Sequence, residues 1–588
     1  MHRERVRLIR LIIMKQLAFL CTTLLTGLTG LSLVKAATYY AKPGGSGSAC
    51  AATSECSVGT SAGKAVAGDT VILRDGNYGR TNLSPANSGN ENAWITFQAD
   101  EGATPIFEGG GVGNSKAEYI RYVGIVSRFN QYGGFGNGWI ASCNNNTSTS
   151  NGYLQYINCI ADGNGINGIA HYCATGLLIQ QSILAHNGNG ADSWSSAVNL
   201  YGVTGGTAAN IVRETVAFDT IDTSSTHSSS GKATDGSGFI ADQGSKGATF
   251  INNVGFENGG SCIRLTNSPN SLIANNTCYG NGKDPLALYN DEILYSDAAS
   301  RTGALLLNNV IVVTTTGKSA IANASGIAQT NNVTNATAAF FVGAPGATNI
   351  DFNLTSAATT LIDKGTTSNA PTSDIGFDPK CIKKGTLTGS NLPSWLSPSS
   401  LPTWWTYVID YEYIQQQGGV AKCFNPRTRA NGPDIGAFEA NGTAGAADAS
   451  GTGGATGGVT ATGGSRATGG TPPADGTNAT GGSIAVSASG GAPARGGAQA
   501  TGGGGAILTS GMIGATGGAR SAAAGGAIAT GGSEVPPGDS ATEAAGGGTI
   551  TSASSGGCSC RITGQGSSAG AIVALLMLAG LLRRRRSS

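Results

Sequence analysis

Two aspartates frame a short apolar segment in the stretch TDGSGFIADQG, which spans residues 234–244. They are Asp235 and Asp242, and the glycines beside them indicate turns. Paired carboxylates can bind a calcium ion or transfer protons while a sugar chain is cleaved. They can also simply hydrogen-bond to the backbone of turns. Which of these applies depends on the elements that carry the two side chains.

The surrounding sequence repeats one short phrase, and this repeat predicts those elements. Each copy is a short strand, a polar corner, a second short strand and an Asn/Gly turn. Asn253 and Asn276 occupy the corner 23 residues apart, as do Asn158 and Gln181. The clearest copies are YLQYINCIADGNG (153–165), LLIQQSILAHNGNG (177–190), ATFINNVGFENGG (248–260) and SLIANNTCYGNG (271–282).

A period this short, without helical periodicity, excludes a propeller blade and favours an all-β solenoid, the right-handed parallel β-helix. Strands of successive coils then stack about 4.8 Å apart. We expect asparagines at equivalent corners to form a hydrogen-bonded ladder. A jelly roll or a β-sandwich is the alternative.

Alignment of four successive coils predicts which side chains point outward. The aligned segments are GIAHYC (168–173), AVNLYG (197–202), GFIADQ (238–243) and CIRLTN (262–267). Strand alternation points Ile169 and its equivalents inward, and we expect His171 to lie inside as well. A register shift of one residue would reverse this assignment. The outward columns are Ala170, Asn199, Ile240 and Arg264, and beside them Tyr172, Tyr201, Asp242 and Thr266.

These columns predict an exterior strip that recognises a sugar chain through Tyr172, Asn199 and Tyr201. A long insertion, residues 219–238, precedes Asp242 and is expected to approach the strip. It carries Asp219, Asp222, His227, Lys232 and Asp235. The acidic stretch YNDEILYSD (289–297) is interpreted as a solvated insertion.

Several segments resemble the pectate-lyase-like superfamily of right-handed parallel β-helix proteins. They are the entry GDTVILRDGNY (68–78), WITFQADEGATPIFEGG (94–110), the coil phrases, and LIDKG (361–365) with NGPDIGAFE (431–439). The resemblance implies the fold more strongly than the chemistry, because the superfamily contains lyases, glycosidases and non-catalytic adhesins.

In lyases of this superfamily, a Lys or Arg on the exterior removes the substrate proton and aspartates hold calcium. The resemblance therefore implies Lys232, Lys246 or Arg264 as base or clamp. It implies Asp235, Asp242 and Glu257 as ligands of Ca²⁺. The acidic cluster expected one coil later reads ENGGSC (257–262), which offers Glu257 alone.

We expect action on an acidic polysaccharide by β-elimination. A glycoside hydrolase would use two of the carboxyls Asp235, Asp242 and Glu257 as acid and base. A non-catalytic glycan-binding adhesin or structural surface protein is the third hypothesis. In the structural alternatives, Asp235 and Asp242 are turn residues and Arg264 is the ion-pair partner of Asp242.

The 588-residue chain divides into four segments by composition. Residues 1–37 have the basic start, apolar core and small-residue site of an export signal. Residues 38–440 carry the repeats and form the predicted β-helix domain. Residues 441–557, rich in Gly, Ala and Thr, are predicted to be a disordered linker. Residues 558–588 resemble a myxobacterial C-terminal sorting tail, with two cysteines, a short hydrophobic helix and a cluster of four arginines at residues 583–586.

These segments predict a secreted protein displayed at the outer surface of the cell. Membrane contact is expected through the tail alone, and the protein is expected to be a monomer. With 35 basic and 34 acidic residues there is no basic field to attract nucleic acid. Nine cysteines lie from Cys50 to Cys423, so at least one is unpaired. Cys50–Cys56 and Cys381–Cys423 are the expected disulfides.

Overall fold

The protein is described by a computed structural model, which covers residues 35–444 and Gln16 with several gaps. The gaps are residues 115–116, 131–135, 142–151, 174, 191–193, 206–208, 224–231, 389–391, 398, 400, 430–431 and 441–442. The export signal, almost all of the linker and the C-terminal tail predicted from the sequence therefore lie outside the described residues.

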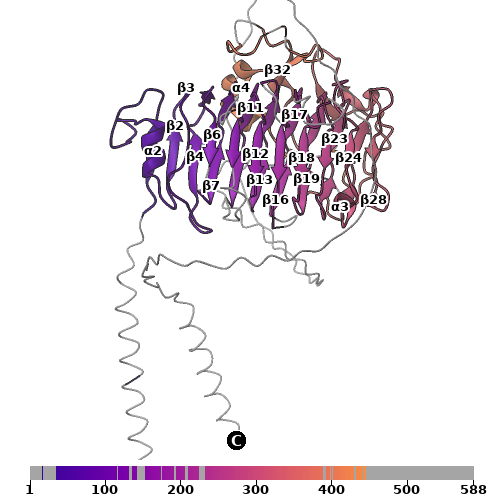
Figure 1. Ribbon diagram of the computed structural model, residues 1–588, viewed down its shortest axis with the longest axis horizontal. Coiled ribbons are helices and arrows are strands. Elements are labelled where there is room, and N and C mark those ends of the chain that lie inside the picture. The colour runs from indigo at the N-terminus through magenta and orange to yellow at the C-terminus, as the bar shows by residue number, and fades with distance from the viewer. Residues whose placement is uncertain are drawn as a thin grey trace, which may run out of the picture. The chain divides into compact units, whose positions relative to one another are not determined.

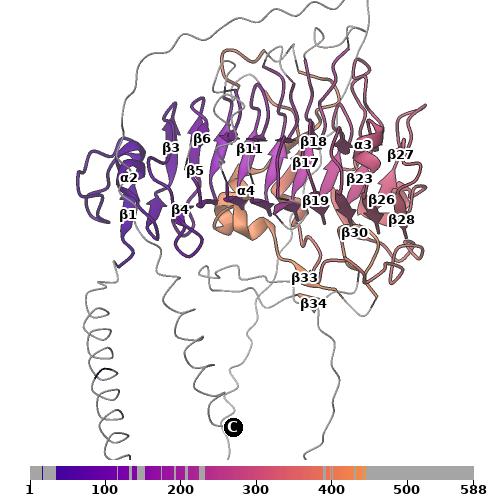
Figure 2. The same ribbon diagram turned by 60° about the horizontal axis from the view of Figure 1, so that its bottom comes forward.

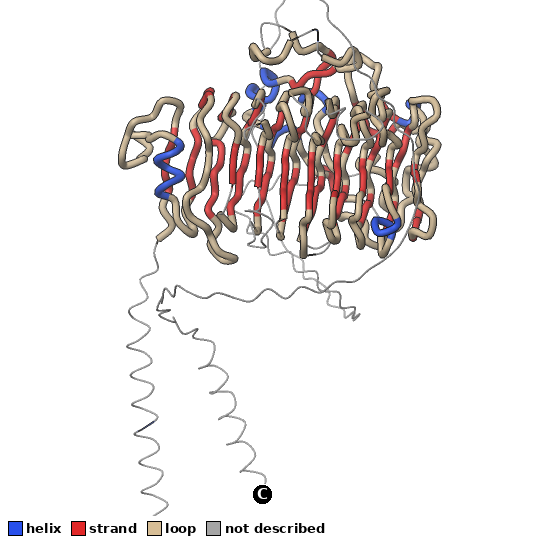
Figure 3. Tube along the Cα trace, viewed as in Figure 1, coloured by secondary structure: helices blue, strands red, loops and turns tan. Residues whose placement is uncertain are grey.

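Three long parallel sheets form the body of the molecule, with 11, 9 and 8 strands (Figures 1 and 3). The chain visits sheet 1, sheet 2 and sheet 3 in turn and then begins the next coil. Every strand pair within these sheets is parallel, for example β10 with β13 and β12 with β15. The predicted parallel β-helix is confirmed.

Sheet 1 consists of β1 (Thr38–Ala41), β2 (Thr70–Leu73), β4 (Ile95–Ala99), β7 (Ile120–Val123), β10 (Leu154–Ile157), β13 (Leu177–Gln180), β16 (Asn210–Arg213), β19 (Ala248–Ile251), β22 (Leu272–Ala274), β25 (Leu305–Leu307) and β28 (Ala328–Thr330). Sheet 2 consists of β3 (Gly76–Gly79), β5 (Pro105–Glu108), β8 (Val126–Arg128), β11 (Ile160–Asp162), β14 (Ile183–Ala185), β17 (Val216–Phe218), β20 (Val254–Phe256), β23 (Thr277–Tyr279) and β26 (Val310–Val312). Sheet 3 consists of β6 (Val112–Asn114), β9 (Trp139–Ala141), β12 (Ile169–Tyr172), β15 (Val198–Tyr201), β18 (Phe239–Asp242), β21 (Ile263–Leu265), β24 (Ile293–Tyr295) and β27 (Ile321–Ala322).

The other elements are α2 (Val58–Lys64), α3 (Ala298–Arg301), α4 (Tyr411–Gln417), the 3-10 helices η1 (Ala338–Phe340), η2 (Pro379–Cys381) and η4 (Val420–Cys423), and three antiparallel pairs: β29 (Phe341–Gly343) with β30 (Asp351–Leu354), β31 (Ile382–Lys384) with β32 (Tyr407–Ile409), and β33 (Arg427–Thr428) with β34 (Thr443–Ala444).

The corner between sheets 1 and 2 is a two-residue turn that recurs on successive coils. Its first residue has a positive φ, as at Asn252, Asn275 and Asn308, a conformation that asparagine tolerates better than most residues. Its second residue points inward, and Asn253 Nδ2 donates to Asn276 Oδ1 at 3.0 Å. Asn276 Nδ2 donates in turn to Asn309 Oδ1 at 3.0 Å. The predicted asparagine ladder is therefore present inside this corner.

A second ladder, which the sequence analysis did not predict, lies where the chain leaves sheet 2. Asn130 Nδ2 donates to Asn164 Oδ1 at 2.8 Å, and Asn164 Nδ2 donates to Asn187 Oδ1 at 2.9 Å. Further along, Asn281 Nδ2 donates to the carboxyl of Glu292 at 2.7 Å. Each ladder satisfies buried polar groups in a row, so that successive coils keep one register.

After β28 the chain turns back over the outer face of sheet 2, where Figure 2 shows α4 and β30 lying against the solenoid. Many outward side chains of sheet 2 are apolar and buried, among them Phe218 and Phe256. Phe256 packs against Phe352 and Tyr407 of the returning segment. This segment covers a sheet face that would otherwise expose aromatic rings to water.

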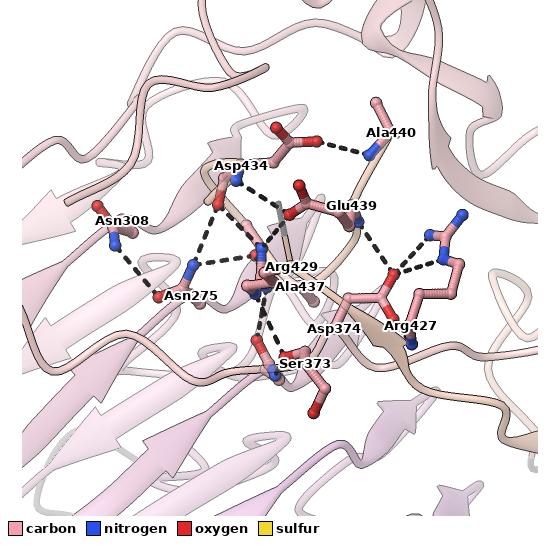
Figure 4. A network of polar contacts seen from close by, with 12 residues as sticks. Asn275, Asn308, Ser373, Asp374, Arg427, Arg429, Asp434, Ala437, Glu439 and Ala440 are labelled. Atoms are coloured by element: carbon pink, nitrogen blue, oxygen red, sulfur yellow. Dashed lines mark hydrogen bonds and ion pairs between the residues drawn. The ribbon is translucent and has the colours of Figure 1, made fainter. Parts of the chain in front are cut away.

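Residues in and beside the motifs LIDKG and NGPDIGAFE hold that segment at the corner between sheets 1 and 2 (Figure 4). Asn275 Nδ2 donates to the Asp434 carbonyl at 3.1 Å, and Asn308 Nδ2 donates to the Thr366 carbonyl at 2.9 Å. Arg429 donates to Glu439 at 3.0 Å and to Asn252 Oδ1 at 2.8 Å. The motifs LIDKG and NGPDIGAFE therefore form the contacts that close the fold.

Three disulfides join described cysteines: Cys50–Cys56, Cys262–Cys278 and Cys381–Cys423. The first and third are the pairs expected from the sequence, whereas Cys262–Cys278 lies inside the solenoid core. Cys159 is a buried free thiol, which agrees with the odd count. Among the described residues, no helix combines the length and apolar character needed to cross a bilayer.

Candidate functional site

The register of sheet 3 places the predicted strip as the sequence analysis expected. Asn199 pairs with Ala170 and Ile240, and Ile240 pairs with Arg264. In the next column Tyr201 pairs with Tyr172 and with Asp242. The inward residues are buried in the core, including His171, whose pKa is lowered to about 3 by burial.

The strip differs from an open face because loops between sheets 2 and 3 cover its first column. Asn199 is 3% exposed and Arg264 is 5% exposed, although both side chains leave the outer surface of the sheet. The segment 233–236 lies over this column and is tied to the loop of the following coils, since Leu288 N donates to the Ala233 carbonyl at 2.7 Å. The sequence predicted the column but not its cover.

The side chain of Arg264 is bound to the segment 233–236, here called the covering loop. Its Nη1 lies 2.9 Å from Asp235 Oδ1 and also donates to the Thr234 carbonyl. Its Nε donates to Ser296 Oγ at 3.1 Å, and its guanidinium lies 4.2 Å from the ring centre of Tyr289. These contacts direct the guanidinium of Arg264 to the segment that covers the strip. In the structural alternative Arg264 was the ion-pair partner of Asp242, whereas the structure pairs it with Asp235.

Asp242 is the carboxyl of the strip that remains available. Its pKa is raised to about 6, first by burial and then by the negative charge of Asp235, while Arg264 opposes the shift. One oxygen accepts a hydrogen bond from the Gln243 backbone at 2.8 Å. Asp235 and Asp242 therefore lie on the same face, and the charge of Asp235 raises the pKa of Asp242. A carboxyl that titrates near neutrality can both take up and release a proton.

Two tyrosines share the column of Asp242, Tyr201 on the adjacent strand and Tyr172 one strand further. The Tyr172 and Tyr201 rings meet edge to face at 5.8 Å between centroids. Tyr201 is 40% exposed, whereas Tyr172 is largely covered and accepts a hydrogen bond from Asn167 Nδ2 at 3.2 Å. Burial and the charges of Asp235 and Asp242 raise the pKa of Tyr172, so that its hydroxyl remains a donor. Beside them, Asn199 Oδ1 is buried without a hydrogen-bond partner among the described residues.

The remaining predicted residues are spread over several places. Lys246 is exposed in the turn after β18, and Lys232 is exposed just before the covering loop. Glu257 lies at the corner after β20, where it pairs with Lys283 at 3.2 Å. His227 lies outside the described residues. The structure thus gathers Tyr172, Asn199, Tyr201, Asp235, Asp242 and Arg264, with Lys246 nearby, and leaves Glu257 apart.

The predicted calcium ligands are not assembled as a set. Asp235 already pairs with Arg264, and Glu257 pairs with Lys283, so two of the three carboxylates have cationic partners. Another group, Asp363, Asp434 and Glu439, brings carboxylate oxygens within 4.8 Å of one another. Glu439 is neutralised by Arg429, however, and Asp434 accepts backbone hydrogen bonds from Asp363 and Ala440. Neither group fits a calcium ion without displacing existing contacts.

The acidic stretch 289–297 was wrongly interpreted as a solvated insertion. It contains β24, a strand of sheet 3, and supplies Tyr289 and Ser296 to the surroundings of Arg264. Glu292 is 1% exposed at the end of the second ladder, and burial raises its pKa to about 8. The continuous apolar run ILY between acidic residues was the signal for a buried strand.

No family model matches this chain, and no curated protein matches it. Solved structures similar to it include pectate lyase Pel9A, with a TM-score of 0.40, 16% identity and coverage of 59% of this chain and 96% of that one. An alginate lyase from Paenibacillus sp. str. FPU-7 has a TM-score of 0.35, 14% identity and coverage of 51% and 94%. A rhamnogalacturonan lyase has a TM-score of 0.28, 14% identity and coverage of 55% and 97%.

Proposed function

We propose that this protein cleaves an acidic polysaccharide on the outer face of sheet 3, with Asp242 as the group that accepts a proton from the substrate. The observation that supports this proposal is a carboxyl of pKa about 6 next to Tyr201 on the adjacent strand, beside an ion pair that holds a second negative charge in place. Such a shifted carboxyl on a surface strip is typical of proton-transfer chemistry.

β-Elimination is the favoured reaction. The ionised carboxylate of Asp242 would remove the proton from the carbon next to a uronate carboxylate, and a double bond would form between that carbon and its neighbour. The bond from the neighbouring carbon to the leaving oxygen would break, and that oxygen would take up a proton from water. The exposed Lys246 and Lys232 are suited to pair with the uronate charge. In this assignment Lys246 and Lys232 bind substrate, Tyr201 offers a ring to the sugar, and Arg264 holds Asp235.

Hydrolysis is less well supported because it requires a second accessible carboxyl. The side chain of Asp235 is 3% exposed and ion-paired, so neither a water molecule nor a sugar can reach it in this arrangement. Calcium has no step in the proposed mechanism, since Asp235 and Glu257, two of its three predicted ligands, are ion-paired. We therefore expect cleavage to persist after chelation.

Export to the cell surface remains part of the proposal. The buried disulfides Cys262–Cys278 and Cys381–Cys423 support it, because such bonds persist mainly in oxidising compartments. The export signal and sorting tail proposed from the sequence would provide the route.

The test is incubation with pectate, alginate and a glycosaminoglycan while the near-ultraviolet absorbance of unsaturated products and the number of reducing ends are followed. Wild type should produce both signals, and Asp242→Asn should lose both. Glu101→Gln, which changes an exposed carboxyl elsewhere, is the control. Reducing ends without absorbance would indicate hydrolysis, and neither signal with retained binding would indicate an adhesin.

A further inference from the structure

A row of ionisable side chains lies at the corner after sheet 2, away from the strip on sheet 3. It contains Asp162, His186 and Asp219, which come from three successive coils and are at most 2% exposed. Residues 401–424, here called the latch segment, pack over this row. The latch segment contains β32, α4 and η4, and its Trp405 ring lies 5.1 Å from the His186 ring.

The contacts of His186 require an additional proton. Its Nε2 lies 2.8 Å from the carbonyl oxygen of Tyr407 in the latch segment, and a carbonyl can only accept. Its Nδ1 lies 2.7 Å from Asp162 Oδ1, while Tyr411 donates its hydroxyl to the other oxygen of that carboxyl at 2.8 Å. With Nε2 protonated, the Nδ1 contact also needs a proton, carried by the imidazole or by Asp162.

The neighbouring charges favour an imidazolium paired with an ionised carboxylate. Arg128 lies close to Asp162 and favours its charged form, although Arg128 is itself paired with Glu108 at 3.0 Å. A neutral His186 beside an ionised Asp162 would set two lone pairs against each other at 2.7 Å. The arrangement is stable only while the extra proton is present.

Asp219 lies under the same segment. It is 0% exposed and lies 3.8 Å from His186 Nε2. The Tyr407 backbone lies near its carboxyl, but no donor among the described residues reaches either oxygen with hydrogen-bond geometry. Burial, followed by the charge of Glu257, raises the pKa of Asp219 well above its usual range, while Lys283 opposes the shift. An imidazolium at His186 favours the charged form of Asp219, so the additional proton is assigned to the His186–Asp162 pair alone.

We propose that Asp162 and His186 form a proton-dependent latch that holds residues 401–424 on the solenoid and releases them as the pH rises. Docking takes up one proton at the His186–Asp162 pair. This proton is retained by the docked form and lost by the released form in alkaline solution. The equilibrium constant for docking should therefore fall about tenfold per pH unit for each proton taken up. The Cys381–Cys423 disulfide keeps the released segment attached as a loop.

Hydrogen exchange of the backbone amides in residues 401–424 of the full-length protein tests this latch. After correction for the intrinsic rise of exchange with pH, opening should increase about tenfold per unit above neutrality. Amides in the sheet 1 strands β10 and β13 should not follow this dependence. Asp219→Asn leaves the His186–Asp162 pair in place and should keep this slope.

Tyr411→Phe and Tyr413→Phe are a matched pair for this experiment. Both residues lie in α4 and donate a hydroxyl to an aspartate, Tyr411 to Asp162 at 2.8 Å and Tyr413 to Asp378 at 2.7 Å. Tyr411→Phe should lower the pH at which the latch segment opens, whereas Tyr413→Phe should leave it unchanged. Equal effects of the two variants would contradict the latch.

A direct readout is nitrogen NMR of protein labelled on its four histidines. One histidine should keep both ring nitrogens protonated at pH 8, and its signal should disappear in His186→Gln. Four neutral imidazoles at that pH, or exchange in residues 401–424 that is independent of pH, would overturn the proposal. Neither result depends on whether the protein cleaves polysaccharide.

Discussion

Arg264 has almost no exposed surface, and its charge is balanced by Asp235, the Thr234 carbonyl and the Tyr289 ring. At the scale of single residues, such burial decides what a charged group does. Asp242 lies on the neighbouring strand in the second column, where it keeps a titratable carboxyl. The sequence analysis expected Arg264 as base or clamp and Asp242 as a calcium ligand, and their burial suits them to other roles.

Replacement of Arg264 by methionine should destabilise the protein. It removes the partner of Asp235 and leaves that carboxylate buried, which typically costs about 3–5 kcal/mol of unfolding free energy. Thermal and denaturant unfolding would measure the loss, and Arg80→Met, at an exposed arginine, should change stability little. A loss of activity without any loss of stability would instead assign Arg264 to catalysis.

The pH dependence of activity should follow Asp242. A base must be ionised, so kcat/KM for polysaccharide cleavage should rise as the pH passes about 6 and then level off. Asp235→Asn removes the negative neighbour that helps to raise the pKa of Asp242, so the rise should move to lower pH. A profile that is flat between pH 5 and pH 8 would contradict Asp242 as the base.

Glu292 should make stability fall as the pH rises. Burial raises its pKa to about 8 in the folded protein from the usual 4.5 of a glutamate, so its folded form holds a proton that the unfolded form loses. This contribution is complete below the unfolded value and is lost on passing through about 8, with a slope of about 1.4 kcal/mol per pH unit between the two. Melting temperatures of wild type and Glu292→Gln across this range would show it, since the variant should lack that slope.

At the scale of elements, the corner between sheets 1 and 2 has two functions. Its inward residues form the ladder Asn253–Asn276–Asn309, which keeps successive coils in register. Its outward residues, such as Asn275 and Asn308, hold the C-terminal segment through its backbone carbonyls. The doubled asparagines of the repeat phrase therefore connect the solenoid to its cover.

Asn276→Ala should be more damaging than Asn332→Ala. Asn276 accepts from Asn253 and donates to Asn309 and to the Phe250 carbonyl, all buried, and each unsatisfied group costs about 1–3 kcal/mol. Asn332 lies at the ladder's partly buried end. Denaturant unfolding of the two variants would compare them, and equal losses would argue against a ladder that stabilises through burial.

At the scale of the whole molecule, the C-terminal segment completes the core. Outer side chains of sheet 2 and the returning chain form one buried apolar cluster that includes Phe218, Phe256, Phe352 and Phe438. This cluster is separate from the core inside the solenoid. The body therefore has two hydrophobic cores that share sheet 2.

Two truncated chains should differ in stability, because only the longer one keeps the C-terminal segment that covers sheet 2. A chain that ends at residue 335 would expose the outer face of sheet 2, so it should bind a hydrophobic dye and aggregate. A chain that ends at residue 444 keeps the cover and should melt like the full-length protein. Size-exclusion chromatography and thermal unfolding would compare them, and a soluble, stable product ending at 335 would contradict this account.

The sequence by itself determined the coil repeat, the strand register, the inward and outward faces of sheet 3 and the need for an unpaired cysteine. These depend on alternation and spacing over a few residues, and the columns around Asn199 and Tyr201 follow from them. Only the tertiary structure decided which outward residues are covered. Arg264 meets Asp235 through a loop, and His186 meets Tyr407 from 221 residues away. Contacts between residues so far apart in the sequence do not appear in its repeats. They depend on the length of the loops and on the path of the C-terminal segment back over the solenoid.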